Sequence, residues 1–238
     1  TKISNSDLGI YVFNNANNNT IGGSAAGEGN TIVGSAGTDG IKVQQSSGTI
    51  IQGNYIGTNS AGASGLGNYY AGIFFEVSAA NNSVGGTAAG QGNVIAHNGL
   101  RGIGMHNTGT TGNSILGNSI HSNGGLGIDL NFGDDVTAND VGDADTGSNN
   151  RQNFPIITGA TATSSLITIV GTLNSNASRN YRIEFFASTA ADGIGYGEGQ
   201  TYLGFTNVTT NGSGNASFSA PLSMSVANNA FISATATD

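Results

Sequence analysis

The chain has 238 residues, a formal net charge of -8 and only six Lys and Arg residues together. So few cations cannot neutralise several phosphates, which excludes nucleic acid as a partner. No run approaches the roughly 18 apolar residues of a membrane span, so we expect no membrane insertion. The absence of Cys excludes disulfides and thiolate metal sites.

The first half of the chain contains an internal repeat. Residues 19–34 return nearly unchanged at 82–98, and the segment 49–56 returns as 113–120. These segments are too rich in Gly for helices. Their short β-branched stretches, bounded by Gly and Asn, are typical of brief strands joined by tight turns. The repeat therefore predicts the coils of a β-solenoid.

The repeat places aliphatic residues in three columns, which successive coils would stack about 4.8 Å apart. A further set of equivalent positions holds asparagines, whose side-chain amides are expected to form a ladder. The columns are Ile10, Ile41, Ile73, Ile103 and Ile128; Ile21, Ile51, Val84 and Ile115; and Ile3, Ile32, Ile56, Ile95 and Ile120, while the ladder is Asn30, Asn54, Asn93 and Asn118.

Six of the fourteen acidic residues fall in one segment near the middle of the chain. Three of them are closely spaced and followed by Gly147, a pattern that resembles an oxygen-rich calcium loop. Full EF-hand spacing is missing, and a solvated acidic linker is the alternative interpretation. We predict structural calcium, with the candidate ligands Asp129, Asp134, Asp135, Asp140, Asp143 and Asp145.

From Phe154 onward the repeat vanishes, and β-rich segments separated by turn signals follow. Roughly 85 residues with this spacing predict an immunoglobulin-like sandwich. The predicted strands are 156–161, 166–173, 181–188, 201–209, 216–220 and 231–236, and the phenylalanines expected in the core are Phe185, Phe186, Phe205, Phe218 and Phe231.

The repeat patterns, together with the segment Gly125–Leu130, resemble bacterial secreted proteins with right-handed parallel β-helix repeats. The resemblance covers about residues 1–157 and implies a fold and an extracellular or cell-surface location rather than an activity. The predicted fold is all-β, a right-handed parallel β-helix of about five coils followed by a small antiparallel β-sandwich. The predicted domains are residues 1–132 for the β-helix, 133–153 for the acidic junction and 154–238 for the sandwich.

Parallel β-helices include polysaccharide lyases and glycosidases, so a catalytic function is an alternative that would require suitably placed catalytic residues. A hydrolase needs two carboxylates facing one cleft. Lys42 and Arg101 are expected far from the acidic segment, which argues against a calcium-dependent lyase. The acids between residues 1 and 128 lie in different columns or loops and predict no catalytic pair; they are Asp7, Glu28, Asp39 and Glu76.

Two groups of side chains leave a choice between structure and binding. His97 and His121 are expected in similar surface turns two coils apart, with His106 on another face, rather than in a metal trio. The aromatic segments Tyr69–Tyr70 and Phe74–Glu76 could either pack inward or stack on a sugar ring.

The sequence thus predicts a non-catalytic extracellular structural protein, either a subunit of a surface or matrix fibre or an adhesin stalk. The chain begins in the middle of a coil and ends on a β-rich segment. We therefore expect either that the chain is a fragment of a longer protein or that subunits associate head to tail, with one subunit covering the exposed first coil of the next. A cell-surface glycan is a further candidate partner, and the alternative function is a carbohydrate-binding or polysaccharide-cleaving β-helix protein.

Overall fold

The computed structural model describes residues 5–133 and 135–238 and divides the chain into two compact units. The first unit runs to Val136 and includes Gly147–Asn149, whereas the second contains Thr137–Thr146 and Asn150–Asp238. Ile3, a predicted column residue, and Asp134, a predicted calcium ligand, lie outside the described residues.

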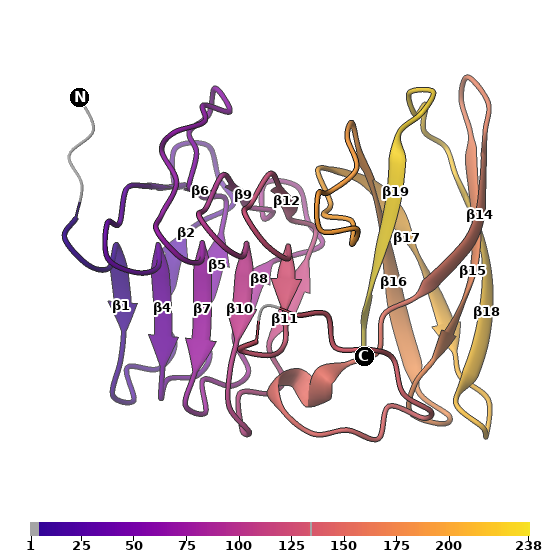
Figure 1. Cartoon of the computed structure of the whole chain (residues 1–238), viewed down its shortest axis with the longest axis horizontal. Coiled ribbons are helices and arrows are strands. Elements are labelled where there is room, and N and C mark those ends of the chain that lie inside the picture. Colours follow the sequence, from indigo (N-terminus) through magenta and orange to yellow (C-terminus); the bar gives the residue numbers. More distant parts are fainter. Residues whose placement is uncertain (1–4, 134) are drawn as a thin grey trace. The chain divides into compact units, whose positions relative to one another are not determined.

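The first unit is a parallel β-helix whose short strands stack in three sheets, one for each predicted column (Figure 1). One sheet contains β1 (Ile10–Val12), β4 (Ile41–Gln44), β7 (Ile73–Glu76), β10 (Ile103–Met105) and β13 (Ile128–Asp129). The second contains β2 (Thr20–Gly22), β5 (Ile50–Gln52), β8 (Ser83–Gly85) and β11 (Ser114–Leu116). The third contains β3 (Thr31–Ile32), β6 (Tyr55–Ile56), β9 (Val94–Ala96) and β12 (Ser119–His121).

The predicted columns are confirmed by the strand register. Ile41 pairs with Ile73, and Ile73 pairs with Ile103, so equivalent side chains of successive coils lie over one another. All three are fully buried. The other two columns keep the same order, because Ile51 pairs with Val84 and Ile56 pairs with Ile95. The columns form one continuous aliphatic core.

The predicted asparagine ladder is also confirmed. The side-chain amide of Asn30 donates to Oδ1 of Asn54, and Asn54 donates in turn to Asn93, each at 3.0 Å. The ladder supplies the buried amides of Asn54 and Asn93 with hydrogen-bond partners. Two further ladders, which the sequence did not predict, run through Asn68, Asn98 and Asn123 and through Asn82 and Asn113.

Glycines at the ends of strands let the coils approach closely. Gly22, at the end of β2, has φ +82°, and a Cβ there would lie 2.1 Å from the carbonyl oxygen of Gln52. Gly85 repeats this geometry against Leu116. Only glycine accommodates both the positive φ and the contact, which explains the repeated Gly of the sequence.

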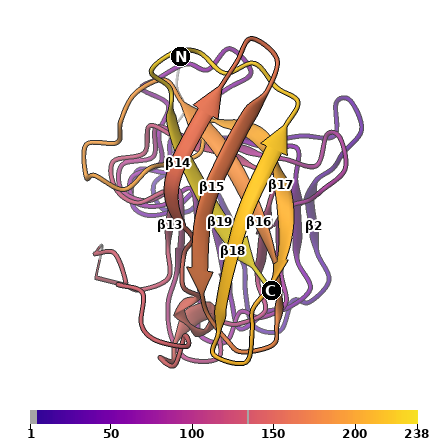
Figure 2. The ribbon, with the colours of Figure 1, turned by 90° about the vertical axis from the view of Figure 1, so that its right-hand side faces the viewer.

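The second unit is a sandwich of two antiparallel three-stranded sheets, seen face-on in Figure 2. The segment 137–153, which includes the 3₁₀ helix η1 (Ser148–Arg151), precedes the first strand of the sandwich. One sheet has the order β14 (Ile156–Ala162), β15 (Ile167–Asn174), β18 (Asn215–Leu222). The other has the order β17 (Thr201–Thr209), β16 (Asn180–Ser188), β19 (Phe231–Thr237). Each predicted strand agrees with an observed one within two residues.

The prediction that five phenylalanines fill the sandwich core is correct for two of them, Phe185 and Phe218. The ring centroids of Phe185 and Phe218 lie 5.5 Å apart in the core. Phe186 is also buried, but outside the core cluster and against the Tyr202 ring at 5.7 Å. Phe205 and Phe231 are 44% and 50% exposed, so the prediction was wrong for these two. The guanidinium of Arg182 covers the Phe205 ring at 3.5 Å, an interaction that compensates for the exposed aromatic face.

Candidate metal site in the acidic segment

Three of the six predicted calcium ligands come together in the second unit. One carboxylate oxygen each from Asp140, Asp143 and Asp145 lies within 4.8 Å of the other two. Such a group can contribute three negatively charged oxygens to a hard cation.

Asparagine side chains hold the backbone of this loop in place. The amide of Asn153 donates to the carbonyl oxygens of Asp140 at 2.7 Å and of Asn174 at 2.8 Å. Asn174 accepts the backbone N–H of Gly142 at 2.7 Å, and Asn139 exchanges two hydrogen bonds with the backbone of Phe154. The loop is therefore organised by the protein itself, before any ion is considered.

Asp143 is the most buried of the three carboxylates, with 5% of its surface exposed. Its Oδ1 accepts the backbone N–H of Asn153 at 2.9 Å, and its Oδ2 accepts the hydroxyl of Ser175 and the amide of Asn176. Burial raises the pKa of the Asp143 carboxyl, although the hydrogen bonds from Ser175 and Asn153 oppose the rise. Asp143 is thus largely engaged in holding the loop.

Asp145 and Asp140 have more coordinating capacity left. Oδ1 of Asp145 is buried and has no hydrogen-bond partner among the described residues, while Oδ2 lies 4.0 Å from the Arg151 guanidinium. Burial and the Asp140 carboxylate raise the pKa of Asp145, and Arg151 opposes the rise. Among the described residues, the Asp140 carboxylate accepts the backbone N–H of Ala144 alone, shared by its two oxygens at 3.2 and 3.1 Å. A bound cation would satisfy the orphaned oxygen and relieve the repulsion, so the donor set fits calcium.

Two other predicted ligands, Asp129 and Asp135, belong to the first unit. Asp129 is buried and lies 3.2 Å from the Arg101 guanidinium, while its Oδ1 accepts the backbone N–H of Asn131. Asp135 is exposed. The expectation that Arg101 lies far from the acidic segment was therefore wrong for Asp129, the first acid of that segment.

Arg101 is the centre of a cluster that the sequence did not reveal. Its guanidinium lies 5.9 Å from the ring centre of Phe74 and 5.8 Å from that of Phe132, and His106 stacks on Phe132 at 4.7 Å. Desolvation lowers the pKa of Arg101, and the Asp129 carboxylate opposes that shift. Because Arg101 and Phe132 lie outside the three columns, repeat register alone could not bring them together.

The spacing of His97 and His121 differs from the expectation. β9 and β12 are neighbours, and the rings of His97 and His121 approach to 6.0 Å. The two histidines thus lie in adjacent coils rather than two coils apart. Burial lowers the pKa of His121, and His97 adds to the effect.

The aromatic segments divide between packing and exposure. Phe75 is fully buried in the core and Phe74 is covered by the Arg101 cluster, whereas Tyr69 and Tyr70 are both exposed with ring centroids 4.8 Å apart. Tyr11 and Phe13 form a second exposed pair.

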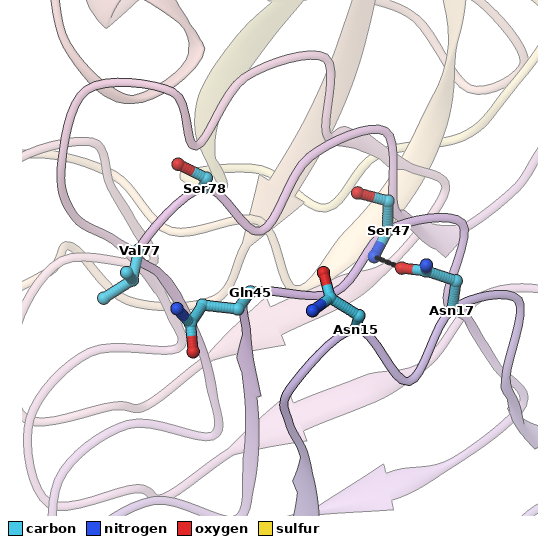
Figure 3. A pocket seen from close by; sticks show the side chains of 6 residues that line it. All are labelled: Asn15, Asn17, Gln45, Ser47, Val77 and Ser78. Atoms are coloured by element: carbon cyan, nitrogen blue, oxygen red, sulfur yellow. Dashed lines mark hydrogen bonds between the residues drawn. The ribbon is translucent and has the colours of Figure 1, made fainter.

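A pocket of about 340 Å³ opens among turns of three successive coils, as Figure 3 shows. Its lining contains amides and hydroxyls and no titratable group, so the pocket can form hydrogen bonds but offers no acid or base. The lining residues are Asn15, Asn17, Gln45, Ser47, Val77 and Ser78.

Comparison with known proteins assigns no family: no protein-family model matches the chain, and no curated protein matches it. Among the described residues, no helix has the length and apolar character needed to cross a bilayer.

Proposed function

We propose that this chain is an extracellular structural protein, a subunit of a surface or matrix fibre or an adhesin stalk, without catalysis. The observation that carries the proposal is the unbroken stacking of the β-helix interior. Aliphatic columns and asparagine ladders both run from coil to coil, as in the pairs Ile41–Ile73 and Asn54–Asn93. A stack held by buried contacts along its axis makes a stiff spacer.

The carboxylates between residues 5 and 132 support a structural role, because each of them has a structural partner. Asp39 accepts the backbone N–H of Ala71 at 3.0 Å, and Glu76 lies 2.8 Å from the Lys42 ammonium. Asp129 is paired with Arg101. The two remaining acids accept local donors, Asp7 from Thr38 and Glu28 from Ala25.

Calcium is part of the proposal, with a structural role. Asp140, Asp143 and Asp145 would supply carboxylate oxygens, and the ion would stabilise the acidic loop of the sandwich unit. The resemblance to secreted bacterial β-helix proteins supports an extracellular location, where calcium at millimolar concentration suits weak oxygen sites.

Head-to-tail assembly is the proposed route to a fibre. In the described part of the β-helix, β1, β2 and β3 pair with β4, β5 and β6 respectively, and the other edge of such a strand can pair with a strand of another molecule. A neighbouring subunit that covers these strands makes a heterologous contact, which propagates rather than closes. Electron microscopy across a concentration series tests this: filaments are expected, and particles of monomer size at every concentration would contradict it.

The second candidate function is carbohydrate binding, which the exposed Tyr69–Tyr70 pair favours. Aromatic faces of this kind stack on sugar rings. A glycan array and a reducing-sugar assay separate the two functions. Binding that is lost in Tyr69→Ala, but kept in Val141→Ala at another exposed site, would favour the second function, and release of reducing sugar would overturn the non-catalytic proposal.

A further inference from the structure

The two sheets of the sandwich have four edge strands, and three of them carry a feature that blocks further pairing. β14 has a bulge between Ile157 and Gly159, and β17 has one where Leu203 is the extra residue. β18 contains Pro221, which cannot donate a backbone hydrogen bond. Bulges and prolines are established protections of sheet edges.

The fourth edge, β19, has none of these features along Phe231–Thr237. Its seven residues pair with β16 in one uninterrupted register, and the strand contains no Pro, no Gly and no charged side chain. Among the described residues its sheet neighbour is β16 alone. A regular, uncharged edge of this length is a template for strand addition.

The interior side of β19 is also incompletely covered. Ile232, Ala234 and Ala236 pack against the sandwich core yet stay half-buried, whereas Ile183 and Phe185 of the neighbouring β16 are fully buried. A further strand beside β19 would cover the exposed flank of these three side chains.

We propose that the strand added to β19 is β19 of a second copy, running antiparallel about a two-fold axis at Ala234. The sequence of β19 is self-complementary in this register. Ile232 would lie opposite the second copy's Ala236 on the inner face, and Ser233 opposite its Thr235 on the outer face. These central pairs match apolar with apolar and hydroxyl with hydroxyl, Phe231 lies opposite Thr237 at the ends, and no like charges face each other.

This contact goes beyond the head-to-tail assembly proposed above. A two-fold contact uses the same surface on both copies and closes at a dimer. The three-stranded sheet β17–β16–β19 would become a continuous six-stranded sheet, with each sandwich on one side of the axis. A dimer joined through its sandwiches is compatible with both functions proposed above, the structural one and carbohydrate binding.

Sedimentation equilibrium of the whole chain tests the proposal with Thr235→Lys. Thr235 lies opposite Glu184 of β16, so the added ammonium does not oppose folding of the monomer. Across the two-fold axis, however, the two ammonium groups would be diagonal neighbours and repel. The control is Ser219→Lys, an exposed position on the protected edge strand β18. Far-UV circular dichroism verifies that both variants fold.

The wild type and Ser219→Lys are expected to sediment at twice the monomer mass, and Thr235→Lys to dissociate with a dissociation constant at least tenfold higher. A wild type that stays monomeric, or equal dissociation constants for the two variants, would overturn the proposal. Dimer mass is read at concentrations below those that give filaments, so failure of head-to-tail assembly would be seen separately by microscopy.

A cysteine placed on the two-fold axis tests the register independently. The chain has no Cys, so Ala234→Cys introduces one thiol per subunit. Opposite residues of an antiparallel pair have Cβ atoms about 4.5–5.5 Å apart, near the span of a disulfide. Mild oxidation is expected to give a covalent dimer, with Ser219→Cys as the control. Equal crosslinking of both variants, or none at Ala234→Cys, would overturn the register.

Discussion

Asn93 and Asn118 are joined by two hydrogen bonds that use one acceptor. Oδ1 of Asn118 receives the side-chain amide of Asn93 at 2.8 Å and its backbone N–H at 3.0 Å. The Asn93 amide also donates to the carbonyl oxygen of Ile51 at 2.8 Å. Asn93 thus links the preceding coil, through Ile51, to the following coil, through Asn118, so the ladder helps to set the spacing of the coils.

Asn93→Asp should destabilise the β-helix strongly. The substitution keeps the size but removes the donor, and it leaves a buried carboxylate facing the carbonyl oxygen of Ile51 and Oδ1 of Asn118. An uncompensated buried charge costs about 3–5 kcal/mol of unfolding free energy, measurable by urea denaturation. Asn107→Asp is the control, because Asn107 is exposed and its Oδ1 accepts the N–H of Val77. Equal losses in the two variants would contradict the ladder's role.

Ile73→Ala tests the first column. Ile73 is fully buried between Ile41 and Ile103, so the truncation opens a cavity and should cost about 2–5 kcal/mol. Ile50→Ala is the matched control, since Ile50 is 39% exposed on the opposite side of its strand from Ile51, and should cost less than about 1 kcal/mol. A loss for Ile73→Ala no greater than that of the control would contradict the stacked core.

Asp39→Asn should change how stability depends on pH. Burial raises the pKa of Asp39 above its ordinary value, despite the hydrogen bond from Ala71 and the nearby Lys42 and Arg101. A raised pKa means that the folded chain favours the protonated acid, so this contribution to stability is present near pH 4 and is lost as pH rises through the folded-state pKa. The neutral amide should therefore raise the melting temperature at pH 7 relative to the wild type, with a smaller difference at pH 4. A melting temperature lowered at pH 7 would contradict this reading.

Calcium should stabilise the sandwich unit, and chelation should reverse the effect. At a free concentration one hundred times its dissociation constant, a ligand bound only to the folded state adds about 2.7 kcal/mol. Asp145→Asn should abolish the calcium-dependent shift in melting temperature, since Oδ1 of Asp145 is the unpartnered oxygen of the cluster. Asp192→Asn, on an exposed loop, should keep it. No shift in the wild type would favour the solvated acidic linker instead.

The β-helix was predictable because equivalent residues of its repeat make the same contacts in successive coils. Each member of the column Ile41, Ile73 and Ile103 recurs with the same neighbours, so equivalent positions in the sequence become stacked positions in space. Observed sandwich strands also follow the alternation of the sequence, as at Thr201–Thr209. Alternation did not distinguish Phe205 from Phe185, because a bulge at Leu203 shifts which face of β17 each residue occupies.

The candidate metal site was predictable only in part. Close spacing identified Asp140, Asp143 and Asp145, which the loop brings together. The same spacing could not show that Asp129 forms an ion pair with Arg101, because that pairing depends on where non-repeating side chains meet after the coils have stacked. It also could not show that Asn153 and Ser175 occupy the oxygens of Asp143.

The amino-acid sequence by itself determined the stacked coils, the asparagine ladder and the presence of a second β-rich unit. Apolar and amide side chains at periodic positions are buried when equivalent residues of successive coils stack on one another. Only the tertiary structure decided the partners of the non-repeating charges and the protection of each sheet edge. The physical reason is that repeated residues meet their own equivalents, whereas Arg101, Asp129 and β19 (Phe231–Thr237) owe their surroundings to segments far away in the chain.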